Sequence, residues 1–283
     1  GRLPGLWLAS QRTNVLFDYW LVWLLRLWGP TAAQRIAVGA AVLIFAWGAF
    51  GLVSRVNGRR PWHLMPCIAM LAYGWVFHAG LFNFYISLGL CLWALALWWR
   101  RKPVWMATAA FLLGVAWLAH ALPVLWAGGA ALYLRLAERL PTRLRLLLLG
   151  AGAAAVCLVT WVLTPFSPHS WDRSQALSML GLDQLWVYGR RYLWVSLGLL
   201  LVWTLLGARL LEECHWRDLL ASVPFHWLAL TALGILLVPG GLQPPGYDYA
   251  LKYIPERMSL AAAVLVCVIL GAARPAKWTK FAL

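Results

Sequence analysis

The sequence predicts an all-α integral membrane protein, a polytopic bundle of transmembrane helices. Hydrophobic residues make up 63% of the 283 residues and charged residues only 12%, whereas an ordinary soluble domain carries about 25% charged residues. A bilayer-crossing helix needs about 20 mostly apolar residues, and apolar stretches near this length follow one another along the chain. These features exclude a disordered chain, a disulfide-dense secreted module and an ordinary soluble enzyme.

About nine membrane helices are expected within a single domain that covers residues 1–283. Their expected ranges are 34–53, 62–77, 81–99, 104–119, 122–136, 145–164, 192–211, 219–238 and 257–273. The ranges 62–77 and 122–136 are short, so these two could be buried inside the bundle without crossing fully. The bundle is thus expected over 34–273, after an outer segment at 1–33 and before a cytoplasmic tail at 274–283.

The segment before the first span predicts an amphipathic helix that lies in the outer membrane interface. At about 100° per residue, its polar residues fall on one arc and its apolar residues fall outside that arc. The polar residues are Gln11, Asn14, Asp18 and Arg26. A helix with this pattern lies in the plane of the interface. The alternative is a further spanning helix that packs Asp18 and Arg26 inward.

The net charge of +15 follows the connections between the spans. A soluble protein with this balance would suggest nucleic acid as a partner. Here most Lys and Arg residues lie in every second connection, after the first, third, fifth, seventh and ninth spans. By the positive-inside rule these connections face the cytoplasm. We therefore expect no nucleic-acid partner and a multi-pass location in a bacterial inner membrane.

Polar and ionisable residues gather on the expected outer side, where they are candidates for function because such groups are costly near membrane depth. They lie at two tight turns, near 78–83 and 120, and in two long loops, 165–191 and 239–256. The candidate catalytic acids are Asp18, Asp172 and Asp183. The candidate substrate-binding residues are His78, Asn83, His120, Tyr247, Asp248, Lys252, Glu256 and Arg257.

Simpler structural roles are open for most of these residues. His78 and His120 could cap helix ends, and Asn83 could hydrogen-bond a neighbouring helix. Asp183 could cap a short loop helix, because aspartate accepts hydrogen bonds from the free N–H groups there. A solvated turn and a local ion pair are the alternatives for the adjacent pairs Asp172-Arg173 and Glu256-Arg257.

Considered as one site, these groups suit the transfer of a sugar from a lipid carrier. A carboxylate can take a proton from an acceptor hydroxyl. Lys252 and Arg257 can hold a phosphate, since arginine offers a fork of donors, and the apolar spans can hold a lipid tail. The sequence contains none of the motifs GxGxxG, Walker A, HExxH and GxSxG. Their absence favours a lipid-carried donor over a soluble nucleotide sugar.

Four short motifs carry a resemblance to a known class of enzymes. They are GLFNF at 80–84, AH at 119–120, GLDQ at 181–184 and YIPER at 253–257. In this layout the chain resembles the GT-C class of integral-membrane glycosyltransferases, particularly its bacterial mannosyltransferase-like members. The resemblance implies a polyprenyl-phosphate sugar donor, an outward-facing site and inversion at the sugar carbon.

The resemblance also implies a catalytic acid in the first outer loop, after an initial spanning helix. Asp18 is the acid near the matching place, and it lacks the paired acid of many members. Because the chain begins at Gly1 with no such helix, we expect an incomplete N-terminus, with the base either at Asp18 or upstream, or else a non-catalytic relative. Asp172 and Asp183 are then acceptor-side or metal-assisting groups.

The expected partners are membrane lipid and the lipid-linked sugar donor. A divalent cation is left open as a cofactor, and no residues are assigned to a metal. One alternative is a haem-handling or assembly protein, because two outer histidines could serve as axial ligands. Another is a transporter or scaffold subunit, although related halves and mid-span charges, which are common in transporters, are not evident.

Overall fold

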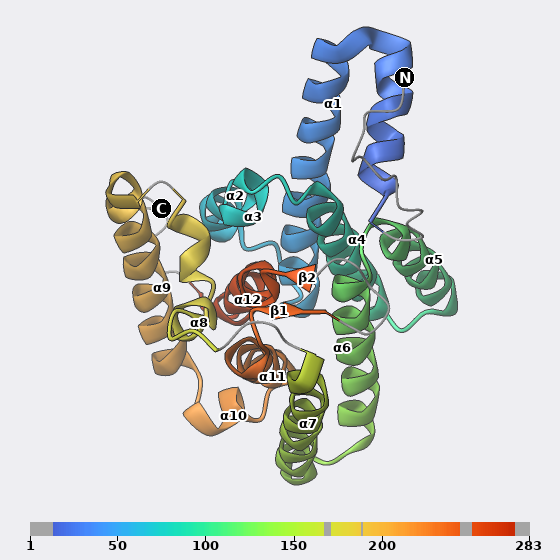
Figure 1. Ribbon diagram of the computed structural model, residues 1–283. Helices are drawn as coiled ribbons and strands as arrows, with labels where there is room; N and C mark the ends of the chain where they lie inside the picture. Colours follow the sequence, from blue (N-terminus) through green and yellow to red (C-terminus); the bar gives the residue numbers. More distant parts are fainter. Residues whose placement is uncertain (1–13, 167–170, 188, 244–250, 275–283) are drawn as a thin grey trace.

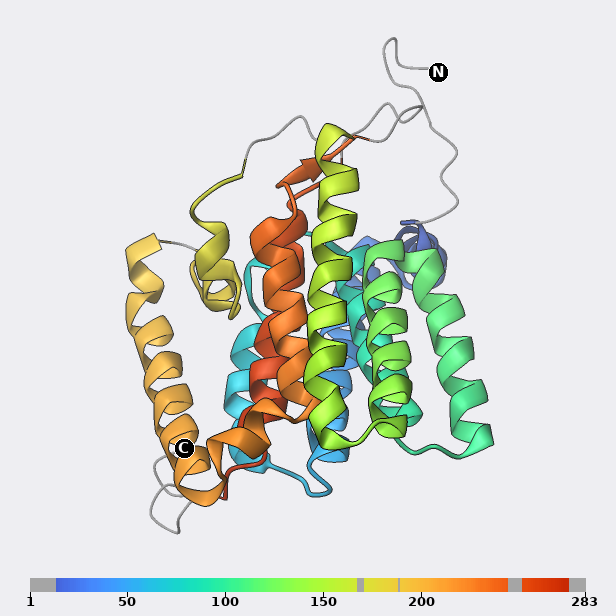
Figure 2. The same ribbon diagram turned by 90° about the horizontal axis from the view of Figure 1, so that it is seen from below.

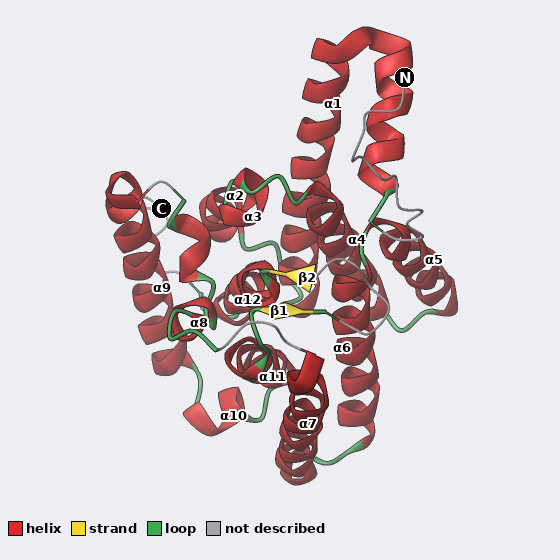
Figure 3. Cartoon of the chain, in the orientation of Figure 1, coloured by secondary structure: helices red, strands yellow, loops and turns green. Residues whose placement is uncertain are grey.

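The computed structural model describes residues 14–166, 171–187, 189–243 and 251–274, which fold into an all-α bundle (Figure 1). The sheet found among these residues is a short antiparallel pair, β1 (Gly241–Leu242) and β2 (Leu251–Lys252). Gly241 pairs with Lys252, and Leu242 pairs with Leu251. Figure 3 shows the β1–β2 pair in yellow among the helices, which are red. The expected all-α fold class is therefore confirmed.

The first helix, α1 (Leu16–Val56), is bent at Gly29, whose φ of 73° and ψ of 173° are not helical. Pro30 follows it and has no N–H to donate to the preceding turn, so a break at this point is expected. The bundle helices stand upright in Figure 2, and the limb before the bend is seen end-on. That limb therefore runs across the bundle axis.

Six of the expected spans each form one helix with similar bounds. They are α4 (Phe82–Trp98), α5 (Pro103–Ala119), α6 (Ala121–Arg139), α7 (Thr142–Leu163), α9 (Leu193–Glu213) and α12 (Ile254–Leu270). Short helices connect them on the way: η2 (Thr164–Phe166), α8 (Gln175–Ser178), η3 (Leu182–Leu185) and η4 (Gly189–Tyr192). Apolar composition and length thus located these helices well.

Two expected spans are not single helices. The range 62–77 divides into η1 (Trp62–Leu64), α2 (Met65–Ala72) and α3 (Trp75–His78), and the break at Gly74 is where the side chain of Gln184 packs against the backbone. The range 219–238 divides into α10 (Trp216–Leu220) and α11 (Val223–Leu237), because Ser222 caps a new helix by accepting a hydrogen bond from Phe225 N.

The expected count of nine membrane helices is not confirmed. By length and apolar composition, three helical segments among the described residues could cross a membrane: Leu16–Val56, Thr142–Phe166 and Gly189–Glu213. The helices α4, α5 and α11 are apolar but shorter. No residue of α7 is buried, and large apolar side chains such as Leu147 and Trp161 are exposed along it. Such a surface is suited to contact with lipid.

The core is built around α4 and α12. Along α12, most residues from Met258 to Leu270 are buried, and α4 is buried over most of its length. The helices α1 and α4 approach closely at Gly48 and Gly89, where a Cβ atom on Gly48 would lie 2.6 Å from the carbonyl oxygen of Gly89. Small residues allow this approach between apolar helices.

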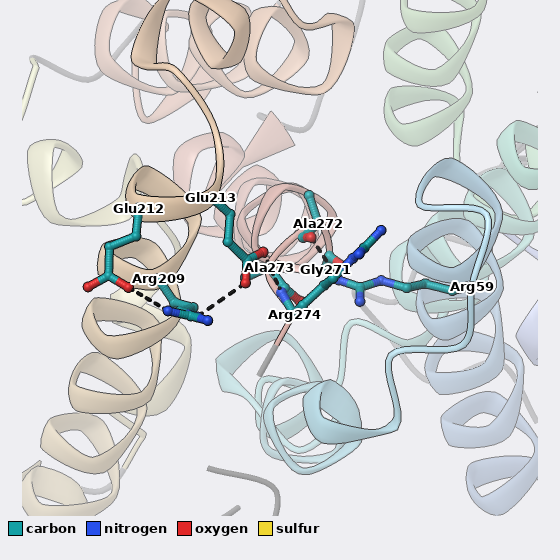
Figure 4. A network of polar contacts seen from close by, with 8 residues as sticks. All are labelled: Arg59, Arg209, Glu212, Glu213, Gly271, Ala272, Ala273 and Arg274. Atoms are coloured by element: carbon teal, nitrogen blue, oxygen red, sulfur yellow. Dashed lines mark hydrogen bonds and ion pairs between the residues drawn. The ribbon is translucent and has the colours of Figure 1, made fainter. Parts of the chain in front are cut away.

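Several basic connections meet at one end of the bundle, around the C-terminus of α12 (Figure 4). The guanidinium of Arg59 donates to the carbonyl oxygens of Gly271, Ala272 and Ala273. A cation at this position satisfies the unpaired carbonyls and opposes the negative end of the helix dipole. On α9, Arg209 pairs with Glu212 at 2.7 Å and with Glu213 at 3.1 Å, and Glu213 accepts from the backbone N–H of Arg274. These contacts fasten α1 and α9 to α12.

Candidate functional site

The candidate site lies at the other end of α12, where its first turn begins. The β1–β2 ribbon leads into Tyr253, which adopts a left-handed conformation with φ of 60°, and Pro255 then occupies the first turn. The ring of Tyr253 lies edge-on to Trp75, with ring centroids 5.4 Å apart. This local structure fixes the direction in which Glu256 and Arg257, the next two residues, leave the helix.

Arg257 contacts His120 from the connection between α5 and α6. Its Nη1 lies 3.0 Å from His120 Nε2. The ring of Phe84, at the start of α4, lies 5.4 Å from the imidazole and 6.0 Å from the guanidinium, centre to centre. The Nε of Arg257 is buried and has no hydrogen-bond partner among the residues that the structure describes. Three elements distant in sequence thus meet at one guanidinium.

His120 is also the N-cap of α6. Its Nδ1 accepts a hydrogen bond from the backbone N–H of Leu122 at 3.2 Å, and its carbonyl accepts from Ser87 Oγ at 2.8 Å. The side chain is 7% exposed. Burial, and then the nearby Arg257, lower the pKa of His120 to about 4, so the imidazole is neutral at pH 7. The capping role considered from sequence is confirmed, and it coexists with the contact to Arg257.

A second cluster lies on the opposite side of α12, because Ser259 follows Arg257 by two positions, about 200° around the helix. Ser259 Oγ donates to Asp183 Oδ2 at 2.8 Å. Gln184 Nε2 donates to Ser259 Oγ at 2.6 Å and to the carbonyl of Glu256 at 2.7 Å. Among the described residues, the Oδ1 of Asp183 and the Oε2 of Glu256 are buried without a hydrogen-bond partner.

The environment of Asp183 opposes its ionisation. Burial is the largest cause and raises the pKa of Asp183 to about 6, the hydrogen bond from Ser259 acts in the opposite direction, and the charge of Glu256 raises it further. The interpretation of Asp183 as a helix cap is wrong, because the N-cap of η3 is Gly181 and no side chain caps it. The local ion pair considered for Glu256 and Arg257 is likewise absent among the described residues, since Glu256 Oε2 has no partner and Arg257 contacts His120.

Gly181 explains how the GLDQ segment reaches α12. Its φ is 76°, and a Cβ atom there would overlap the side chain of Ala263 and lie 2.6 Å from the carbonyl oxygen of Ser259. Glycine is the residue that both the backbone conformation and this close approach permit. The loop can therefore place Asp183 directly against α12.

Asp18 is brought to the same end through Asn83. Asn83 Nδ2 donates to Asp18 Oδ2 at 2.9 Å and to the carbonyl of Asn14 at 3.0 Å, while its Oδ1 accepts from the backbone N–H of Phe17 at 2.7 Å. Asn83 thus hydrogen-bonds a neighbouring helix, as one of the sequence interpretations expected. Asp18 itself is exposed, and Asn83, to which it is bonded, is the residue before Phe84.

The remaining candidates are exposed or lie outside the described residues. His78 is exposed and lies edge-on to the adjacent ring of Phe77, with centroids 5.3 Å apart. Asp172 is exposed, and its Oδ1 accepts from the backbone N–H of Ser174 at 2.9 Å, which confirms the turn expected there. Lys252 is exposed on β2. Tyr247 and Asp248 lie outside the described residues.

Sequence reasoning missed Ser259, Gln184 and Phe84 as members of the site. Ser259 follows Glu256 by three positions on a helix, a spacing that places two residues on one face and could have drawn attention to it. Gln184 belongs to the quoted GLDQ motif, but nothing in the sequence shows that its amide joins α3 and α12. Within the part of the chain that the structure describes, no group of three or more His, Cys, Asp or Glu side chains could hold a metal ion.

The fold and the site define the class: an all-α protein with helices able to cross a membrane and with a buried polar cluster at one end of the bundle. Comparison with known proteins adds no relative. No family model matches the chain, and no curated protein or solved structure matches it either.

Proposed function

We propose that this protein is a membrane glycosyltransferase that moves a sugar from a polyprenyl-phosphate carrier to an acceptor at the outer face of the membrane. The observation that carries the proposal is the environment of Arg257. Its guanidinium is largely enclosed, and its side-chain hydrogen-bond partner among the described residues is a neutral imidazole, while the adjacent Glu256 acts on it through its charge. The cation is therefore available to an incoming anion.

A phosphate is the anion that this arrangement favours. A buried charge is costly unless it is paired and hydrogen-bonded, and the Nε of Arg257 has no acceptor within the described part of the chain. Arginine binds phosphate oxygens through two parallel N–H donors. The exposed apolar faces of α7 and α9 offer the carrier's hydrocarbon chain a path beside the bundle. These features together support a phosphate whose tail lies in lipid.

The chemistry is a single displacement at the sugar carbon. The acceptor hydroxyl attacks that carbon, the bond to the phosphate oxygen breaks, and the carrier phosphate leaves with the electron pair. A carboxylate takes the proton of the hydroxyl, and the sugar carbon is inverted. Asp183 suits this role because a base with a pKa of about 6 is ionised at pH 7 yet accepts protons readily. Asp18, held by Asn83, is the second candidate base.

Sidedness completes the proposal. The basic connections, among them the one that carries Arg59, belong on the cytoplasmic side by the positive-inside rule. The cluster around Arg257 and Asp183 then belongs on the outer side of a bacterial inner membrane. The haem-handling alternative receives less support, because both ring nitrogens of His120 already have contacts.

Transfer from a polyprenyl-phosphate sugar, measured with the full chain in proteoliposomes, tests the proposal. Arg257→Ala should lower the rate by at least about 10²-fold, the size of effect seen when a charged transition-state contact is removed. Arg257→Lys should retain part of the rate because the charge remains. Arg173→Ala is the matched control, since Arg173 is an exposed arginine of the long loop that contains Asp183. Unchanged transfer by Arg257→Ala would remove this residue from the site.

A further inference from the structure

The contact between His120 and Arg257 is one hydrogen-bond acceptor short. A guanidinium can only donate, and so can a backbone N–H. His120 faces a guanidinium at Nε2 and the N–H of Leu122 at Nδ1. A neutral imidazole has one acceptor nitrogen and one N–H. Whichever tautomer is present, one of the two contacts therefore places two N–H groups against each other.

The helix cap indicates which contact carries the mismatch. Nδ1 accepts from Leu122 N, in the position where an N-cap side chain satisfies a free donor of the first turn. In the tautomer that keeps this cap, the proton of the neutral ring lies on Nε2, 3.0 Å from Arg257 Nη1. Two donors that meet at this distance in a buried site are favourable only when an acceptor joins them.

A third donor, the Nε of Arg257, is buried and also lacks an acceptor among the described residues. An anionic oxygen group placed beside this pair would accept from Arg257 and from His120 together, and would neutralise the guanidinium. The aromatic wall at Phe84 closes one side of the pair without competing for these hydrogen bonds.

We propose that His120 and Arg257 form a two-residue clamp for a phosphodiester, and that His120 takes up a proton when the phosphodiester binds. The proposal deepens the proposed function, because the ligand is the phosphate of the lipid-linked donor. The imidazolium would donate through Nε2 to one phosphate oxygen while Arg257 donates to another. Proton uptake converts a neutral contact into a charge-assisted hydrogen bond.

The charges around His120 support this coupling. Arg257 from α12 is the charged group in contact with it, while α4 contributes the uncharged Phe84 and Ser87. Glu256 adds a carboxylate to the same turn of α12. Without a bound ligand, burial and the charge of Arg257 keep the pKa of the His120 imidazole at about 4. A bound anion offsets Arg257, so the pKa of His120 is higher in the complex than in the unliganded protein. Binding then strengthens as the pH falls from the pKa of the complex toward the pKa of about 4 of the unliganded protein.

The experiment measures binding of two phosphodiesters to the purified full chain in dodecyl maltoside. Dihexadecyl phosphate represents a lipid source, and diethyl phosphate represents a free one. Isothermal titration in buffers of different ionisation enthalpy reports protons taken up on binding. For the lipid probe we expect uptake of a proton on binding. We also expect the affinity to rise by up to about tenfold for each unit by which the pH falls, in the range between the pKa values of His120 with and without the bound probe.

The variant His120→Asn separates titration from structure. Asparagine caps helices well, so the start of α6 should be retained, yet it cannot take up a proton in this range. We expect this variant to bind the lipid probe more weakly, without proton uptake and without the pH dependence. His215→Asn is the matched control, because His215 is also a helix N-cap, of α10, but is exposed. It should behave as the unchanged protein does.

The outcomes separate this inference from the proposed function. Proton uptake that persists in His120→Asn, or binding that is independent of pH in the unchanged protein, would overturn the clamp even if sugar transfer were observed. The absence of any binding of either probe would also overturn it. Binding with proton uptake through His120, in a protein that transfers no sugar, would support the clamp and reject the transferase. Equal affinity for diethyl phosphate would support the clamp with a free phosphodiester as its ligand.

Discussion

Asn83 fastens Asp18 to the start of α4. The Nδ2 of Asn83 donates to Asp18 Oδ2 at 2.9 Å, while its Oδ1 accepts from the backbone N–H of Phe17 at 2.7 Å. The side-chain amide of Asn83 therefore caps α1 and orients the carboxylate of Asp18, which was predicted from the sequence as a candidate base. The contact links residues 65 positions apart, and it ties the limb of α1 that crosses the bundle axis to the central helix.

Replacing Asn83 with alanine should destabilise the protein by about 1–2 kcal/mol, the usual cost of losing a helix cap and its hydrogen bonds. The loss should appear as a lower unfolding midpoint in detergent. Thr108→Ala removes an exposed hydrogen bond within α5 and should change the midpoint little. Equal effects from the two variants would contradict the capping role of Asn83.

Asp183 should set the pH dependence of sugar transfer. Because its pKa is raised to about 6, the rate should increase as the pH rises through this value and the carboxylate loses its proton. Asp183→Asn should lower transfer by about 10²–10⁴-fold. If Asp18 is the base instead, Asp183→Asn will leave the pH profile of transfer in place.

Ser259 should act on the rate through Asp183. Its hydroxyl donates to Asp183 Oδ2 and so favours the ionised carboxylate. In Ser259→Ala the pKa of Asp183 should rise further, and the midpoint of the pH profile of transfer should move to higher pH. A fall in rate with no change of midpoint would indicate a packing role only.

Stability should respond to pH through two opposing groups. The pKa of Asp183 rises from 3.8 to about 6 on folding, so its contribution is fully present below pH 3.8 and is lost as the pH rises through 6. The pKa of His120 falls from 6.5 to about 4, so its contribution is present above pH 6.5 and is lost as the pH falls through 4.

Between about pH 4 and pH 6 these two contributions therefore partly cancel. In His120→Asn the Asp183 contribution should remain, and the unfolding midpoint should fall more steeply with rising pH than in the unchanged protein. In Asp183→Asn the midpoint should instead rise with pH over the same range. Denaturant titrations at a series of pH values measure both slopes, and parallel slopes in the two variants would refute the assignment.

Gly181→Ala should both destabilise the protein and impair transfer. The new Cβ atom would overlap Ala263 at a left-handed backbone position, which should cost about 1–3 kcal/mol or more. Gly189→Ala is a close control, since Gly189 has a similar positive φ of 65° and no neighbouring atom within 4 Å. The expected result is a much larger loss of stability and of transfer for Gly181→Ala, measured by thermal unfolding and by the transfer assay.

The sequence determined those helices for which apolar composition and length were sufficient evidence. Long apolar stretches bounded by basic residues predicted α4, α5, α6, α7, α9 and α12, because burial in lipid or protein requires both apolar composition and adequate length. The rule failed at Gly74 and Ser222, where the chain remains apolar but a loop side chain or a new helix cap interrupts it. For that reason hydropathy alone overestimated the continuity of the helices.

The site depended on the tertiary structure. Sequence placed His120, Asp183 and Arg257 at the same end of the bundle, through the alternation of connections. Only the packing of α12 against α11, α1 and the GLDQ loop decided that Arg257 meets an imidazole and that Asp183 meets Ser259. Side-chain partners depend on helix rotation and on close approaches such as that at Gly181, and neither quantity is encoded in the hydropathy of a single helix.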